Sequence, residues 1–133
     1  MQDVTMGTAV LLDEYVSAWN EADPERRRSA VGRLYSDRAR IVATNAEVNA
    51  EAVLEHIGEV FAQFIGSSEH RFRCTAWTAH HRCVLLRWEL TAPGLPLAGS
   101  GVNMLQLGQD GRIEADYQFS ELEPAAESAA ASR

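Results

Sequence analysis

Three polar side chains that could do chemistry lie inside two segments that otherwise alternate as β-strands do: Asn103 in 97–107, and Asp116 and Gln118 in 112–120. An amide donates and accepts hydrogen bonds, and a carboxyl group exchanges protons. Asp116 and Gln118 share one strand face, because side chains alternate with a period of two. That face either meets solvent, as its polarity favours, or lines a pocket. In an apolar pocket, desolvation would raise the pKa of Asp116, and the residue could serve as a general acid or base near neutral pH.

A pair of oppositely charged residues, Arg87 and Glu89, lies in the segment 81–91. These two residues alternate with Trp88, so only one of the two sets can face the interior. If Arg87 and Glu89 face inward, they could orient a substrate or a water molecule, and Arg87 would keep a nearby carboxylate charged. If they face outward, they form an ordinary surface pair with little influence on function. The competing inward set is also a good core face, and it consists of Val84, Leu86, Trp88 and Leu90.

Aromatic and histidine side chains supply candidates for the wall of a pocket. Trp19 and Phe61 lie on apolar faces of helical segments, where spacing alone cannot separate core from pocket wall. His56 lies one residue from the apolar stripe of its helix, so it is either a boundary residue or part of a pocket mouth. The four histidines show no zinc-type spacing, and we expect no metal site and no cofactor.

These side chains must be positioned by helices that come first and strands that follow. Helical periodicity covers 4–20, a second helix begins after the capping pair Asp23-Pro24, and a third over 50–65 can be capped by Asn49. The strands are expected at 39–43 and at about 69–77, 81–91, 97–107 and 112–120. This order predicts an α+β fold in which a curved, mostly antiparallel sheet forms a cone, with three helices packed on its concave face, as in a cystatin-like α+β barrel. The mouth of such a cone is a natural ligand site.

The composition excludes several classes of protein. The chain of 133 residues carries a net charge of −7, and all twelve basic residues are arginine, so we expect no nucleic-acid partner. No apolar run approaches the roughly 18 residues of a membrane span, and we expect a cytoplasmic protein with no membrane partner. We expect one domain over 1–122 and a flexible tail over 123–133. A hairpin turning at 78–79 would set Cys74 opposite Cys83, which makes a disulfide conceivable, but free thiols are expected in a reducing cytosol.

The order of elements, with "LLDEYVSAWNEADPERRRSAVGRLYSDRARIV" at the front and "GSGVNMLQLGQDGRIEADYQF" at the back, resembles the nuclear transport factor 2-like superfamily. That superfamily includes ketosteroid isomerase, limonene epoxide hydrolase and the SnoaL-like polyketide cyclases, and the chain most resembles its SnoaL-like group. The resemblance covers roughly residues 5–121. It implies a hydrophobic ligand that is steroid-, terpene- or polyketide-like, and a homodimer formed through the outer face of the sheet.

The resemblance also implies roles for individual residues. Tyr15 and Asn103 match the isomerase pair that holds a substrate oxygen, but the position of the isomerase's carboxylate base is Ala43, which cannot take a proton. Arg87-Trp88-Glu89 resembles the Arg-x-Asp of the epoxide hydrolase. The second acid of that enzyme matches Gln118 or, two residues earlier, Asp116.

Together these observations predict a SnoaL-like binding protein or enzyme that acts on a hydrophobic, oxygen-bearing molecule by proton transfer, as an isomerase, cyclase or epoxide hydrolase does. The alternative is a non-catalytic ligand-binding or dimerisation domain with a collapsed or vestigial pocket. The candidate catalytic residues are Asp116, Tyr15 and Asn103. The candidate substrate-binding residues are Arg87, Glu89, Gln118, Trp19, Phe61 and His56.

Overall fold

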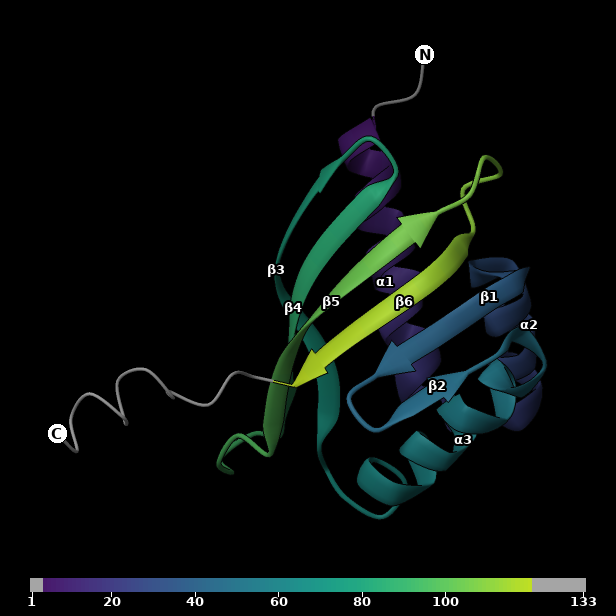
Figure 1. Ribbon diagram of the computed structural model, residues 1–133. Helices are drawn as coiled ribbons and strands as arrows, with labels where there is room; N and C mark the ends of the chain where they lie inside the picture. The colour runs from purple at the N-terminus through teal and green to yellow at the C-terminus, as the bar shows by residue number, and fades with distance from the viewer. Residues whose placement is uncertain (1–3, 121–133) are drawn as a thin grey trace, which may run out of the picture.

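The computed structural model describes residues 4–120, as three α-helices and six strands (Figure 1). The predicted tail over 123–133 and the domain boundary at 122 lie outside the described residues. The helices are α1 (Val4–Asn20), α2 (Pro24–Leu34) and α3 (Val53–Phe64). The strands are β1 (Tyr35–Ala43), β2 (Ala46–Val48), β3 (Arg71–His80), β4 (Cys83–Thr91), β5 (Gly99–Leu107) and β6 (Ile113–Ser120). Within this part of the chain, no helix is long and apolar enough to cross a membrane.

The helices begin and end close to where the sequence predicts. Asp23 caps α2, because its side chain accepts a hydrogen bond from the backbone N–H of Glu25, and Pro24 occupies the first helical turn. The third helix differs from the prediction at its start. Asn49 makes no side-chain capping bond, and a 3-10 turn over Ala50–Ala52 precedes α3.

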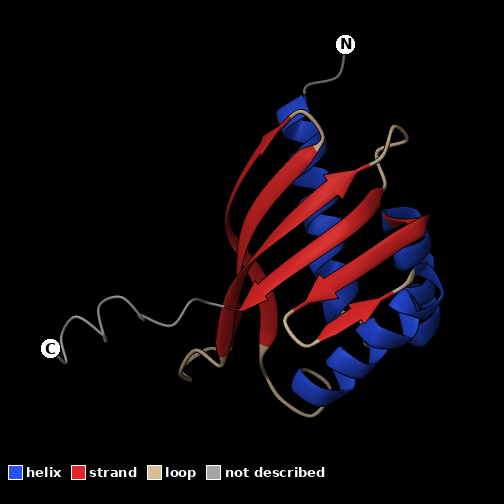
Figure 2. Ribbon diagram, in the orientation of Figure 1, coloured by secondary structure: helices blue, strands red, loops and turns tan. Residues whose placement is uncertain are grey.

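The strands form one curved sheet in the order β2-β1-β6-β5-β4-β3. Only the pairing of β1 with β6 is parallel, and the other neighbours are antiparallel. The helices cover one face of this sheet, with α1 running behind β4, β5 and β6 in the view of Figures 1 and 2. The core fills the space between, where Leu12 and Trp19 of α1 meet Leu86, Leu105 and Ile113 of the strands. The predicted α+β cone is therefore confirmed.

A β-bulge in β6 breaks the strict alternation that the sequence predicts. Gln106 pairs with Ala115, but its neighbour Leu107 pairs with Ile113, so Glu114 is an extra residue on β6. As a result, Ile113 and Asp116 are both completely buried, although an odd number of positions separates them. The bulge allows one strand to supply an apolar residue and a carboxyl group to the same interior.

The β3–β4 hairpin turns three residues later than predicted. The turn lies at His81 and Arg82, between the paired residues His80 and Cys83, and His81 has a positive φ of 54°. Cys74 therefore pairs with Trp88 and not with Cys83, and both thiols are free. The register thus removes the cross-strand disulfide that a turn at 78–79 would have permitted.

Gly101 of β5 permits a close approach that fixes one side chain of the interior. A Cβ atom at this position would overlap the backbone carbonyl oxygen of Phe119 and would lie 2.6 Å from the ring of Trp88. The indole of Trp88 therefore lies directly over the β5 backbone. From there its Nε1 donates a hydrogen bond of 3.0 Å to Oδ1 of Asn103.

We expect Gly101→Ala to lower the free energy of unfolding by about 1–3 kcal/mol, the usual cost of overpacking, because the backbone at Phe119 and the ring of Trp88 must both move. Urea denaturation measures this change. Gly32→Ala is the matched control, since its Cβ would meet nothing within 4 Å. In the interior of α2 that control should raise the stability by about 0.5–1 kcal/mol. Equal stability of Gly101→Ala and the wild-type protein would contradict the close approach.

Candidate functional site

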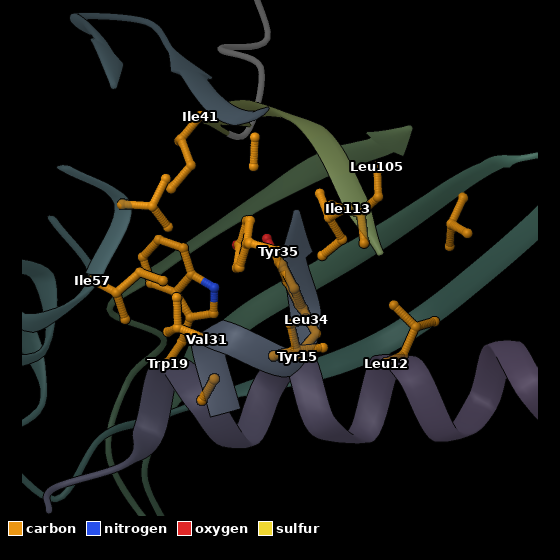
Figure 3. Close-up of a cluster of buried hydrophobic side chains, with 14 of the residues drawn as sticks. Leu12, Tyr15, Trp19, Val31, Leu34, Tyr35, Ile41, Ile57, Leu105 and Ile113 are labelled. Carbon is orange, nitrogen blue, oxygen red and sulfur yellow. The ribbon is translucent and has the colours of Figure 1, made fainter. Parts of the chain in front are cut away.

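The carboxyl group of Asp116 is the centre of the buried polar groups. It comes from β6 and is completely buried. The hydroxyl of Tyr15, on α1, donates a hydrogen bond of 2.8 Å to Oδ2 of Asp116, and the hydroxyl of Tyr35, at the start of β1, donates one of 2.7 Å to the same oxygen. Figure 3 shows Tyr15 and Trp19 projecting from α1 towards the strands, with Tyr35 above Tyr15.

A chain of donors leads from the sheet to this carboxyl group. Trp88 donates to Oδ1 of Asn103, and Nδ2 of Asn103 donates a bond of 2.7 Å to the hydroxyl oxygen of Tyr15. Tyr15 in turn donates to Asp116. The three hydrogen bonds therefore run in one direction, from Trp88 to the carboxylate of Asp116, and an ionised carboxylate can only accept hydrogen bonds. The direction of the chain fixes which way the proton of the Tyr15 hydroxyl points.

Burial raises the pKa of Asp116 to about 6, because the charged form loses its hydration. The hydroxyls of Tyr35 and Tyr15 oppose this rise, since hydrogen bonds to a carboxylate favour the charged form. Gln118 acts in the same direction, although no hydrogen bond of standard geometry reaches the second oxygen, Oδ1. Desolvation and then the charge of Asp116 raise the pKa of both tyrosines well above the usual value, so both stay protonated and donate.

A pocket of about 600 Å³ opens beside this cluster. Its polar end contains Tyr15, Asn103 and Gln118, and Asp116 and Tyr35 lie behind it and do not line it. Its remaining lining residues are Val16, Trp19, Ala43, His56, Val60, Phe64, Phe72, Leu86, Trp88, Leu90, Ala98, Gly99, Ser100 and Ser120. The described residues contain no group of three or more side chains that could hold a metal ion.

Aromatic rings in edge-to-face contact form much of the apolar wall. Phe72 lies with its ring centroid 6.3 Å from that of Trp19 and 5.5 Å from that of Trp88. The ring of His56 is 6.1 Å from Trp19, and burial lowers the pKa of this imidazole, against a weaker opposing effect of Glu59. Trp19 and His56 thus line the pocket, and their contact with a ligand stays a prediction.

Three predicted substrate-binding residues lie outside the pocket, which corrects the sequence analysis. Arg87 is exposed and Glu89 is half-buried, and neither lines the pocket, because β4 turns Trp88 and the apolar set inward. Phe61 packs under the guanidinium of Arg27, 4.9 Å from its ring centroid, and it too is absent from the lining. Arginine and glutamate are expensive to bury, whereas the apolar set gains free energy there.

The structure adds two residues that the sequence analysis does not assign to the site. Tyr35 begins β1, and its hydroxyl donates a hydrogen bond to Asp116. Trp88 appears only as a core alternative, and it anchors Asn103. Neither role follows from local spacing, because the parallel pairing of β1 with β6 and the position of β4 beside β5 are properties of the whole sheet.

No protein-family model and no curated protein matches this chain. Solved structures do resemble it. A SnoaL-like family protein from Agrobacterium tumefaciens, provisionally assigned as an isomerase, has 24% identity over 86% of this chain and 97% of its own, with a TM-score of 0.76. An NTF2-like protein of unknown function from Exiguobacterium has 16% identity over 85% of this chain and 99% of its own, with a TM-score of 0.65.

A third solved structure has the ketosteroid isomerase-like fold and comes from Catenulispora acidiphila, in complex with trimethylamine. It shares 16% identity over 81% of this chain and 82% of its own, with a TM-score of 0.62. The order of the elements, the sheet topology and the similarity to these solved structures all indicate the same fold. The chain has the nuclear transport factor 2-like fold, as the SnoaL-like and ketosteroid isomerase-like proteins do.

Proposed function

We propose that this protein binds a hydrophobic, oxygen-bearing small molecule in its pocket and catalyses a proton transfer on it without a cofactor. One observation carries the proposal: an apolar pocket ends on Tyr15 and Asn103, and the ionisable Asp116 lies directly behind them. A mostly apolar pocket with a few convergent polar groups, one with a shifted pKa, is the usual form of such a site. The pocket volume of about 600 Å³ suits a molecule of steroid, terpene or polyketide size.

The proton reaches Asp116 through Tyr15, because Asp116 does not line the pocket. When Asp116 is protonated, Tyr15 can give its hydroxyl proton to a substrate oxygen beside it and take the carboxyl proton of Asp116 in exchange. The reverse transfer removes the proton from the substrate oxygen and returns one to Asp116. With a pKa of about 6, Asp116 holds a proton for part of the time near neutral pH and can act in both directions. The relay leaves Tyr15 neutral and moves one proton in total between the carboxyl group of Asp116 and the substrate oxygen.

The carbon-bound proton of a ketone needs a separate acceptor within the pocket. His56 lines the pocket, and burial lowers the pKa of its imidazole, so the ring is neutral near pH 7 and can accept a proton. Keto–enol isomerisation then moves one proton between His56 and the carbon, and another between Tyr15 and the oxygen. This division of labour replaces the carboxylate base that is missing at Ala43.

Assembly through the outer face of the sheet belongs to the same proposal. Leu85 of β4 and Phe119 of β6 are 44% and 53% exposed, and Met104 lies opposite both Leu85 and Tyr117 on this face. A homodimer would cover this apolar surface.

A non-catalytic ligand-binding domain is the second candidate. It is favoured by Ala43, which lines the pocket where the family's isomerase carries its base, and by the position of Asp116 behind the lining. In that case the same pocket holds its ligand and no proton moves.

Tyr15→Phe should weaken the binding of an apolar ring alcohol such as a decalol by about tenfold, the cost of one net hydrogen bond. Quenching of the fluorescence of Trp19 and Trp88, which line the pocket, measures the binding. Tyr117→Phe is the matched control, because the Tyr117 hydroxyl accepts from Arg40 and is not in the pocket lining. Equal affinities of the two variants would show that Tyr15 does not contact the ligand.

Catalysis is tested by following deuterium exchange at the α-carbons of a decalone in heavy water by NMR, which reports enolisation whatever the natural product is. We expect the wild-type protein to accelerate the exchange, and Asp116→Asn to slow the protein-catalysed rate by about 10²-fold or more. Tyr117→Phe should keep the wild-type rate. A wild-type protein that binds the decalone without accelerating the exchange would establish the non-catalytic alternative.

A further inference from the structure

Tyr15 meets the pocket with its hydrogen-bonding capacity already partly used. Its single proton is donated to Asp116, and one of its lone pairs accepts from Nδ2 of Asn103. A phenolic oxygen has one donor and can accept at its remaining lone pair. Towards a ligand, Tyr15 therefore presents an acceptor and no donor, as long as Asp116 is ionised.

The neighbours of Tyr15 lock this arrangement. Asn103 cannot rotate its amide without losing the bond from Trp88 to Oδ1, so its Nδ2 stays directed at Tyr15. Tyr35 donates to Oδ2 of Asp116, the same oxygen that accepts from Tyr15, so the carboxylate is held from two sides. All five hydrogen-bonded residues are buried or half-buried, and a reversed bond would leave a polar atom unpaired at a cost of about 1–3 kcal/mol.

We infer that the pocket selects ligands whose polar group donates a hydrogen bond, namely a hydroxyl or the hydroxyl of an enol, over the ketones of the same shape. This inference rests on the proposed function and names its substrate class. Asn103 keeps one further amide hydrogen, and Gln118 also lines the pocket, so ketones still bind. The preference is therefore a moderate one, set by Tyr15.

The enol is also the form that a proton-transfer site must stabilise. Catalysis requires stronger binding of the species along the reaction than of the starting ketone. An acceptor at Tyr15 is complementary to the enol hydroxyl and not to the carbonyl oxygen. The polarity of Tyr15 thus favours the intermediate over the ground state.

Protonation of Asp116 removes the preference. A protonated carboxyl group can donate to Tyr15, which then turns its own proton towards the pocket. The titratable groups that face Asp116 are Tyr15 from α1 and Tyr35 from β1, and both stay protonated. Asn103 of β5 and Gln118 of β6 do not titrate. His56 of α3 titrates within the pocket, and a variant must separate its effect from that of Asp116.

The test compares a decalol with the matching decalone, which have nearly the same shape, by quenching of tryptophan fluorescence in the full chain. At about pH 8 we expect the decalol to bind about tenfold more tightly, the value of one hydrogen bond. At about pH 5, below the pKa of Asp116, the two affinities should come within about threefold. Asp116→Asn, which keeps His56, should show that small ratio at both pH values, and Tyr117→Phe should behave as the wild-type protein does.

Each outcome decides the inference. Equal or tighter binding of the decalone at about pH 8 overturns the inference and leaves the proposed function standing. A preference that persists unchanged at the lower pH also overturns it, because the polarity of Tyr15 would then be independent of Asp116. If neither compound binds, the proposed function fails and the inference fails with it. If Asp116→Asn does not fold, the comparison of the wild-type protein at the two pH values decides alone.

Discussion

A buried carboxylate is expensive, and the Asp116 carboxylate is held by neutral groups: the hydroxyls of Tyr15 and Tyr35 and the nearby amide of Gln118. Desolvation and these hydrogen bonds act against each other, and the pKa of about 6 is their balance. A cation in the same place would hold the carboxyl group ionised at all physiological pH values. Neutral donors leave Asp116 able to gain and lose a proton, which a proton-transfer site requires.

The rest of the fold is arranged so that these groups meet. Tyr15 comes from the first helix, Tyr35 from the first strand and Asp116 from the last, and the parallel pairing of β1 with β6 puts Tyr35 and Asp116 on neighbouring strands. The bulge at Glu114 turns Asp116 inward while Ile113 remains in the core. Without that extra residue, Ile113 and Asp116 would lie on opposite faces of the sheet.

The sequence predicts the three helices and most of the strands, because helical and strand periods are local properties, although β1 begins at Tyr35 and not at residue 39. It also draws attention to Tyr15, Asn103 and Asp116, which the structure brings together. It fails where the answer depends on distant pairing. The inward face of β4 is set by packing of the apolar set against α1, so the Arg87 and Glu89 pair faces outward. Tyr35, Trp88 and the bulge have no local signal, since each depends on which strands become neighbours.

The central claim is that Asp116 is a buried carboxyl group that titrates near pH 6 because its partners are neutral. The most direct measurement is an infrared pH titration of the carboxyl stretching bands, taken as the difference between the wild-type protein and Asp116→Asn, which isolates this one group. The account predicts a midpoint of about 6, shifted upward by Tyr35→Phe, which removes a hydrogen bond that favours the charged form. A midpoint at the ordinary value of about 3.8, unchanged in Tyr35→Phe, would contradict it.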